Sequence, residues 1–238
     1  MKTVVIVQAR MGSTRLPGKA LRSIAGVNMT ERVIQRVRQA GYPLLLAVPD
    51  RDRGMIGNFV TPSEICGGSE KDVLARYYDA ARFYDVGAVV RVTGDCPLVD
   101  PGVIEECRRE FTSPGGWDYF STSHPCRTLP SGFDVEVFSF DALRHAHFTC
   151  ENPVHREHVT QHFYQCPSAL DGSRAACRGR YRLGTYQPHP TDATPEMLKV
   201  KLSVDTEEDL ARVEAVIQRA GENRSWREYT AAAMELSA

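Results

Sequence analysis

A short basic segment near the start of the chain carries the residues best suited to bind phosphate groups. Residues 8–19 read QARMGSTRLPGK, in which Arg10, Arg15 and Lys19 are separated by glycine and serine. Glycine lets the backbone approach a ligand closely and expose its N–H groups, while arginine and lysine neutralise phosphate oxygens. A nucleoside triphosphate needs both kinds of donor, so we predict a phosphate-binding loop here. The alternative is a solvated basic turn.

The spacing within this loop excludes two well-known phosphate-binding motifs. A Walker A loop has four residues between its glycines and then Lys-Ser or Lys-Thr. Here five residues separate Gly12 from Gly18, and Lys19 is followed by Ala20. The G-x-G-x-x-G fingerprint of dinucleotide-binding folds is absent as well. The sequence therefore indicates a phosphate loop of a different kind.

Two aspartates that are distant in the sequence could hold a metal ion. Asp95 follows an apolar run at residues 88–93, and Asp205 follows another at 198–204. Carboxylates at the ends of parallel strands can converge on one Mg²⁺, which prefers oxygen ligands and keeps waters and phosphate oxygens in its shell. Each has an alternative: Asp95 could form a turn, and Asp205, with Glu208 three residues later, could cap a helix.

Alternating strands and helices are expected to position these residues. The apolar runs and helical stripes predict strands at 2–7, 43–48, 88–93 and 198–204, and helices at 30–41, from Ser69, from Asp100-Pro101, and at 206–220. This alternation is typical of a three-layer αβα, Rossmann-like α/β fold with a mostly parallel sheet. Ligands on such sheets bind beyond the carboxyl ends of the strands, so the loops after residues 7, 93 and 204 should form the site.

The bulk properties exclude several function classes. The formal net charge of −1 provides no basic field for a nucleic-acid backbone, so we expect no nucleic-acid partner. No apolar run is long enough to cross a membrane, and the opening run is too short for a signal peptide. Seven cysteines at irregular spacings, without a C-x-x-C pair, are typical of reduced thiols. We expect a cytoplasmic protein.

Between residues 117 and 190 the pattern changes to short strand-like pieces and helical stretches rich in histidine and arginine. No linker separates this region from the rest. We interpret the chain as one domain, residues 1–238, with residues 117–190 as an inserted smaller subdomain on the acceptor side.

Several charged residues of the inserted region are candidates for binding an acceptor. Asp134 and Glu136 lie two apart on an expected strand and so share a face, where carboxylates would suit hydroxyls, an amine or a second cation. The alternative is an exposed polar strand face. Arg127 and Arg156 could anchor an acceptor carboxylate or phosphate, or be ordinary surface arginines.

Residues 145–166 are rich in histidine and cysteine, so a zinc site must be considered. His158 and His162 would share a helix face, but the spacings fit no compact zinc signature, and H-E-x-x-H is absent. We favour a role for His158 in lining the acceptor pocket or in packing at an interface.

The loop at residues 8–19 resembles the signature loop of the CMP-sugar synthetase superfamily, which includes the CMP-Kdo and CMP-acylneuraminate cytidylyltransferases. The chain is most similar to the branch named after spore-coat polysaccharide biosynthesis. The resemblance is colinear over most of the chain, apart from about 165–195, and rests on QARMGSTRLPGKAL, GGSEKDVLARYY, VVRVTGDCPLVDP, LPSGFDVEVFS, REHVT and LSVDTEEDL.

This resemblance implies a nucleotidyltransferase (glycosyltransferase-A-like) fold, commonly a homodimer, for which residues 117–190 are our candidate contact surface. It implies transfer of CMP from CTP to a small, sugar-like acceptor with release of pyrophosphate, with Mg²⁺ held by Asp95 and Asp205. Catalysis would rely on Arg10, Arg15, Lys19 and Asp95, and His158 within REHVT would line the acceptor pocket. The implied nucleotide-binding residues are Gln8, Ala9, Arg10, Gly12, Ser13, Arg15, Lys19, Gly68, Ser69, Asp72, Thr93 and Gly94.

The chain departs from the family pattern at three positions. Gly67 replaces an arginine of many relatives, and Thr93 stands where the CMP-Kdo enzymes have glutamine, so selectivity for cytosine is open. Ser131 replaces the arginine of Pro-Arg-Gly, which removes a cation near the expected acceptor. Three other functions remain: a nucleotidyltransferase of this fold using another nucleotide, a glycosyltransferase, although Asp-x-Asp is absent around Asp95, and a non-catalytic nucleotide-binding regulator.

Overall fold

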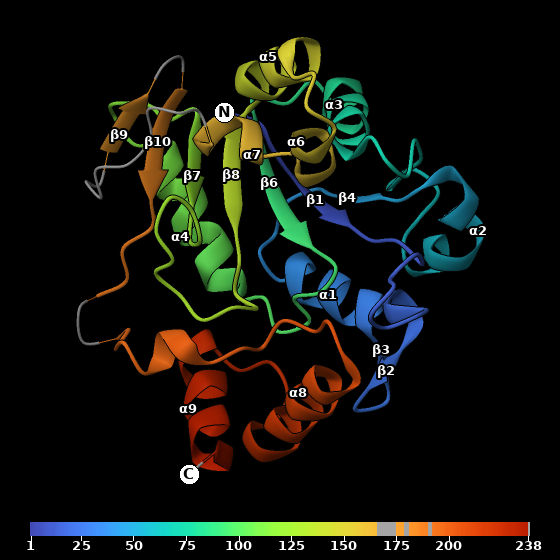
Figure 1. Ribbon diagram of the computed structural model, residues 1–238, viewed down its shortest axis with the longest axis vertical. Helices are drawn as coiled ribbons and strands as arrows, with labels where there is room; N and C mark the ends of the chain where they lie inside the picture. Colours follow the sequence, from blue (N-terminus) through green and yellow to red (C-terminus); the bar gives the residue numbers. More distant parts are fainter. Residues whose placement is uncertain (166–174, 179–180, 190–191, 238) are drawn as a thin grey trace.

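The computed structural model describes residues 1–165, 175–178, 181–189 and 192–237. Within them the chain forms an eight-stranded sheet, in the order β5-β4-β1-β6-β8-β7-β10-β9, and a two-stranded ribbon (Figure 1). The strands of the sheet are β1 (Thr3–Gln8), β4 (Leu44–Ala47), β5 (Ile65–Cys66), β6 (Ala88–Thr93), β7 (Tyr119–Ser121), β8 (Glu136–Ser139), β9 (Ala175–Arg178) and β10 (Tyr181–Thr185), and those of the ribbon are β2 (Ser23–Ile24) and β3 (Val27–Asn28).

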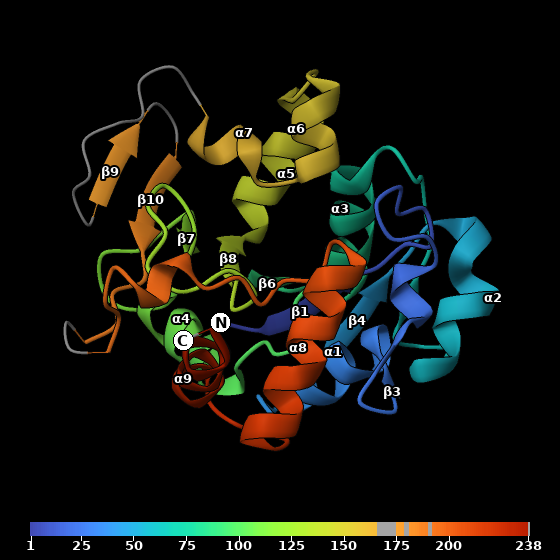
Figure 2. The same cartoon turned by 60° about the horizontal axis from the view of Figure 1, so that its bottom comes forward.

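Helices cover both faces of the sheet (Figure 2). One face packs against α1 (Met29–Arg38), α4 (Pro101–Phe111), α8 (Glu207–Ala220) and α9 (Trp226–Ser237), and the other lies beneath α3 (Val73–Phe83), α5 (Phe140–Thr149), α6 (Pro153–His158) and α7 (Gln161–Tyr164). The remaining elements are α2 (Arg53–Ile56) and the 3-10 turns η1 (Lys19–Leu21), η2 (Asp50–Asp52), η3 (Gly57–Phe59) and η4 (Met197–Lys199). The expected three-layer αβα fold is confirmed.

The continuous apolar run of β1 follows from this layering. Val4 and Ile6 belong to the core beneath α3 and α5, whereas Val5 and Val7 belong to the core beneath α1 and α4. Successive side chains of a strand point to opposite faces, so a strand covered on both faces must be apolar at every position.

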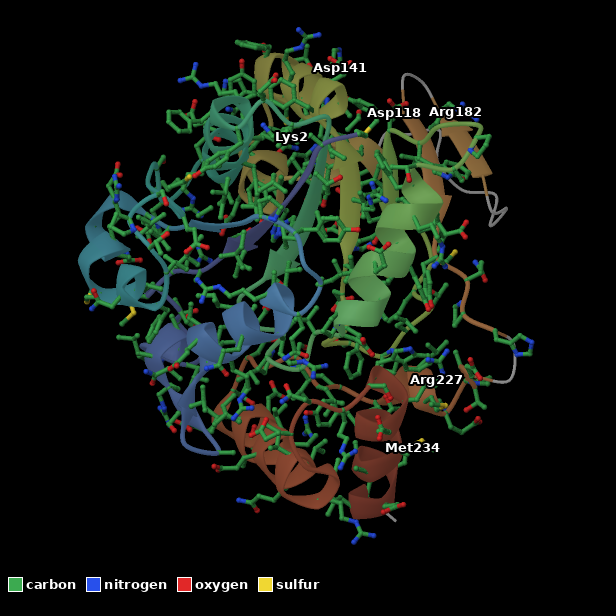
Figure 3. The ribbon with its side chains drawn as sticks, turned by 180° about the vertical axis from the view of Figure 1, so that it is seen from behind. Lys2, Asp118, Asp141, Arg182, Arg227 and Met234 are labelled. Atoms are coloured by element: carbon green, nitrogen blue, oxygen red, sulfur yellow. The ribbon has the colours of Figure 1, made fainter. Side chains whose placement is uncertain are left out.

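The sheet is mixed, and its parallel part holds the loops of interest. Among the described strands, β1 pairs in parallel with β4 and β6, and β4 with β5, whereas β8 runs antiparallel to β6 and β7. Seen from behind, Lys2 and Asp141 lie at the end of the molecule where β1 begins, and Met234 on α9 marks the opposite end (Figure 3). The carboxyl ends of β1 and β6 therefore point toward the side of α8 and α9 (Figure 1).

The strand expected at 198–204 is wrong. Residues Met197–Lys199 form the 3-10 turn η4, and the following extended segment makes one parallel bridge, from Lys201 to Ser131, within the described residues. Its alternating apolar side chains, Leu202 and Val204, are buried in the core beneath α8. The Val204 amide donates to the carbonyl of Asp95, so the segment crosses the end of β6 instead of extending the sheet.

One further expectation needs correction. The helix expected from Ser69 begins at Val73, because Asp72 is its N-cap and accepts from the Ala75 amide. Residues 117–190 contribute β7, β8, β9 and β10 to the main sheet, and their helices pack on one of its faces.

Within the described residues, no helix combines the length and apolar character needed to span a bilayer.

Candidate active site

A cleft of about 400 Å³ opens beyond the carboxyl ends of β1 and β6. It brings together the loop after β1, the turn after β6, Asp205, and the end of α6. Most of the expected nucleotide-binding and metal-binding residues line it, namely Gln8, Ala9, Arg10, Gly12, Ser13, Arg15, Lys19, Thr93, Gly94, Asp95 and Asp205. Three of the expected nucleotide-binding residues do not line it: Gly68, Ser69 and Asp72.

Two glycines shape this cleft. The Gly94 amide donates to the carbonyl of Gln8 at 2.8 Å, and a Cβ on Gly94 would lie 2.7 Å from that oxygen. Only glycine therefore lets the ends of β1 and β6 approach so closely. Gly18, with φ of 67°, adopts the left-handed conformation before η1, and Lys19 begins that turn.

Lys19 connects the two expected metal ligands. Its Nζ lies 3.6 Å from Asp95 Oδ2 and 3.5 Å from Asp205 Oδ1, and it donates to the Val204 carbonyl at 2.9 Å. Arg15 also reaches Asp205, at 2.9 Å. Two carboxylates that contact one ammonium nitrogen are close enough to share a cation. Both side chains retain solvent access, 32% for Asp95 and 19% for Asp205, and their oxygen donors suit Mg²⁺.

The structure rejects the alternative that Asp205 caps a helix. Helix α8 is capped by Thr206, whose side chain accepts from the Asp209 amide, and Asp209 completes the capping box. Asp205 is left to face Lys19, Arg15 and Lys201, the last at 3.2 Å. Burial opposes the ionisation of Asp209, but its hydrogen bond from Lys201 and further donors dominate and lower its pKa to about 2.

A buried ion pair borders the cleft. Arg91 on β6 pairs with Glu136 on β8, and its other nitrogen donates to Gln8 Oε1 at 3.4 Å. Glu136 also accepts from the Tyr119 hydroxyl at 2.6 Å and the Thr160 hydroxyl at 2.7 Å. Burial disfavours the Glu136 carboxylate, but Arg91 and these hydroxyls outweigh it, and the pKa of Glu136 lies below its ordinary value.

Sequence reasoning missed Arg91, although it is the one charge in the apolar strand AVVRVT. The alternative that Glu136 lies on an exposed polar strand face is wrong, because Glu136 is only 5% exposed. Its carboxylate oxygens are engaged by Arg91, Tyr119 and Thr160.

A second cavity, of about 310 Å³, adjoins the cleft and shares Arg91, Thr93, Asp95 and His158 with it. Its other lining residues include Arg127, Ser131, Asp134 and Glu136. Arg127 pairs with Asp134 at 2.7 Å. Burial raises the pKa of Asp134, although Arg127 and the Gly132 amide oppose the shift.

Arg156 lies outside both cavities and has a structural role. It pairs with Asp72 at 2.8 Å and donates to the carbonyls of His147 and Cys150, each at 2.9 Å. Asp72 is thereby occupied by the helix cap and by Arg156. Ser69 accepts from the Asp72 amide, and Gly68 packs against Arg76, where a Cβ would lie 2.6 Å from its Cγ.

His158 lines both cavities at the end of α6, where the backbone is strained. Val159, fully buried, has φ of 62° and ψ of −63°, and the Thr160 amide donates to the His158 carbonyl at 2.6 Å. This is a γ-turn with positive φ, which is rare for a β-branched residue and costs on the order of 1–3 kcal/mol. The turn ends α6, so the expectation that His158 and His162 share one helix face is wrong.

Comparison with known proteins places these features in context. The family model described as Cytidylyltransferase matches residues 4–227. An uncharacterized protein of Methanocaldococcus jannaschii, MJ1063, is 30% identical, over 88% of this chain and 80% of its own. The spore coat polysaccharide biosynthesis protein SpsF of Bacillus subtilis is 27% identical over 91% and 87%. A 3-deoxy-manno-octulosonate cytidylyltransferase of Hydrogenovibrio crunogenus is 32% identical over 65% and 59%.

Solved structures share the fold. A cytidylyltransferase from Leptospira borgpetersenii superposes with a TM-score of 0.84 at 23% identity, covering 100% of this chain and 95% of the other. CMP:2-keto-3-deoxy-manno-octonic acid synthetase complexed with CTP gives 0.65 at 17% identity, covering 92% and 99%. Rv0371c of Mycobacterium tuberculosis in complex with manganese gives 0.56 at 14% identity, covering 90% and 98%.

Proposed function

This chain belongs to the cytidylyltransferase family, as its motifs indicated, and we propose that it transfers CMP from CTP to a hydroxyl group of a small sugar or sugar acid, with release of pyrophosphate. A related protein named for 3-deoxy-manno-octulosonate and another named for spore coat polysaccharide support this acceptor class. The function would belong to polysaccharide biosynthesis in the cytoplasm.

The observation that carries this proposal is the convergence of Arg15, Lys19, Asp95 and Asp205 on one cleft at the carboxyl ends of β1 and β6. Three cations of the loop supply positive charge for a triphosphate, and the exposed backbone at Gly12 and Thr14 would supply N–H donors. A regulator could bind a nucleotide with the cations alone, but paired acids beside them suit metal-assisted phosphoryl transfer.

In the proposed reaction an acceptor oxygen attacks the α-phosphorus of CTP, and the bond to the bridging oxygen of pyrophosphate breaks. Asp95 and Asp205 would hold Mg²⁺, which when bound neutralises charge on the phosphates and orients the displacement. Lys19 and Arg15, now paired with these acids, would turn to the phosphate oxygens, and Arg10 would leave Glu157, 3.3 Å away, to do the same. Catalysis then comes from positioning and charge neutralisation.

The second cavity would hold the acceptor, because it adjoins the cleft at Asp95 and His158. Its polar lining includes Arg127 paired with Asp134, and Ser131, which hydrogen-bonds Ser203 at 2.8 Å. Glu136 would act there as the partner that holds Arg91 in place, since its carboxylate is already engaged.

A pyrophosphate-release assay tests the proposal. The four nucleoside triphosphates are each supplied with a panel of sugars and sugar acids and with Mg²⁺. We expect release with CTP and with at least one acidic sugar, and none from Asp95→Ala, whose fold is checked by circular dichroism. Pyrophosphate release with another nucleoside triphosphate favours a nucleotidyltransferase with a different donor. Transfer of sugar from a supplied nucleotide-sugar, without pyrophosphate release, favours a glycosyltransferase. Tight binding of CTP without pyrophosphate release favours a regulator. Full activity of Asp95→Ala would remove Asp95 from the metal role.

A further inference from the structure

A second group of metal-binding side chains lies outside both cavities, in the helical part of residues 117–190. One ligand atom each of Cys150, His155 and His162 lie within 4.8 Å of one another. The three residues come from consecutive elements, because Cys150 ends α5, His155 lies in α6 and His162 in α7. We propose that this Cys-His-His cluster binds a zinc ion, which fastens α5, α6 and α7 together.

The donor set is the one that zinc prefers. Zn²⁺ binds a cysteine thiolate at about 2.3 Å and imidazole nitrogens at about 2.0–2.1 Å, usually in a tetrahedron. Such a tetrahedron spaces its ligand atoms about 3.3–3.6 Å apart, so the side chains would rotate to bring their ligand atoms closer together. Three protein ligands leave a fourth position for a water molecule. Hard cations such as Mg²⁺ disfavour sulfur, which separates this cluster from the carboxylates of the cleft.

The ring nitrogens of both histidines are available to a metal ion. Neither His155 nor His162 has a hydrogen-bond partner for its ring nitrogens within the described part of the chain, and their ring centroids lie 6.3 Å apart. Cys150 is 5% exposed, and its thiol makes only a weak contact, 3.7 Å from the Asn152 carbonyl. Both histidines are only partly buried, so a metal ion from solvent can reach their ring nitrogens.

Zinc at this position would also brace the wall of the cleft. Helix α6 holds His155 and, further along, Glu157 and His158, which line the cleft. The strained turn at Val159 lies between His155 and His162, and a strained turn persists only where its surroundings restrain it. A metal ion held by one residue before this turn and another after it would supply that restraint.

Metal titration of the full-length chain tests the proposal, independently of CTP chemistry. The protein is stripped with a chelator and titrated with Zn²⁺ against a competing chromophoric chelator, in excess Mg²⁺ to occupy the carboxylate pair. We expect one zinc ion per chain. Removal of an outer-shell partner typically reduces metal affinity by about 10–100-fold. Removal of a direct ligand, in Cys150→Ser, His155→Ala and His162→Ala, should reduce zinc affinity by more than this. Cys126→Ser, at an exposed cysteine, and His147→Asn are the matched controls and should retain the affinity.

Cobalt gives a readout that does not depend on the variants' folding. Co²⁺ added to the stripped wild-type chain should produce a thiolate-to-cobalt charge-transfer band, which only a sulfur ligand creates, and Cys126→Ser should keep it. The absence of this band in the wild type overturns the proposal, as does zinc binding that is equally tight in the wild type and in all three ligand variants.

Discussion

At the scale of single residues, Lys19 explains how two acids can lie together in a cleft. Its ammonium group contacts both Asp95 and Asp205 and so offsets the repulsion between their carboxylates. With 17% of its side chain exposed, Lys19 is more enclosed than Arg15, at 65%. We therefore expect the Lys19 ammonium group to supply a fixed positive charge in the cleft, and the exposed Arg15 side chain to change position when the substrate binds.

Replacing Lys19 with methionine should reduce kcat/KM for pyrophosphate release by roughly 100–1,000-fold, the cost of removing one preorganised charge from a transition state. Lys71→Met, at an exposed lysine outside the cleft, is the matched control and should leave the rate unchanged. If kcat/KM of Lys19→Met stayed within a few-fold of the wild-type value, the ammonium group would have no role in catalysis and would only pair with the two acids in the substrate-free protein.

Glu136 gives a prediction on stability and pH. Its pKa is lowered on folding, so the stability it contributes is present above its unfolded value of about 4.3 and is lost as the pH falls through the lower folded value. Glu136→Gln leaves Arg91 buried and unpaired, which should cost about 3–5 kcal/mol in the free energy of unfolding at pH 7. Urea unfolding between pH 7 and pH 3 measures both effects. The variant should lose less stability on acidification than the wild type, and parallel pH curves for the two proteins would contradict the assignment.

At the scale of elements, the start of α8 separates a structural acid from a functional one. Thr206 and Asp209 cap this helix, while Asp205, one residue earlier, faces the cleft. The extended segment before it is anchored by the bond from the Val204 amide to the Asp95 carbonyl, which holds the two acids side by side.

Two neighbouring substitutions test this division of roles. Thr206→Ala should lower the free energy of unfolding by about 0.5–2 kcal/mol and retain most activity, because it removes a helix cap. Asp205→Asn should reduce pyrophosphate release by about 100-fold or more, while unfolding changes by less than about 1 kcal/mol, since its pairs are partly exposed. Chemical denaturation and initial rates give the two readouts, and the reverse pattern would return Asp205 to a capping role.

At the scale of the whole molecule, we keep the prediction that the chain forms a homodimer through residues 117–190. This region exposes Phe148 and Val154, with 69% and 53% of their surfaces accessible. A contiguous exposed apolar patch is a common mark of an interface, and we expect these two side chains to belong to one. Phe148→Asp should weaken self-association by at least about 10-fold in sedimentation, with Phe83→Asp, at an exposed phenylalanine outside this region, as the control. Unchanged association in Phe148→Asp would move the contact elsewhere.

The sequence alone was sufficient for the layers of the fold and for most of the cleft. The apolar runs that became β1, β4 and β6, and the stripes of their helices, are local patterns, and local patterns survive without knowledge of the fold. The loop at residues 8–19 and Asp95 follow such strands directly, so the rule that ligands bind at the carboxyl ends of strands located them.

The tertiary structure decided what depends on residues far apart in the chain. Alternation at 198–204 looked like a strand, but burial of Leu202 and Val204 across the end of β6 satisfies the same pattern. The partnership of Arg91 with Glu136 and the meeting of Cys150, His155 and His162 join separate elements, whose spacing in sequence matches no motif. Cys166, in the same histidine-rich and cysteine-rich stretch, lies outside the described residues. Side-chain chemistry can be read from a sequence, but which side chains meet is set by how the strands and helices pack.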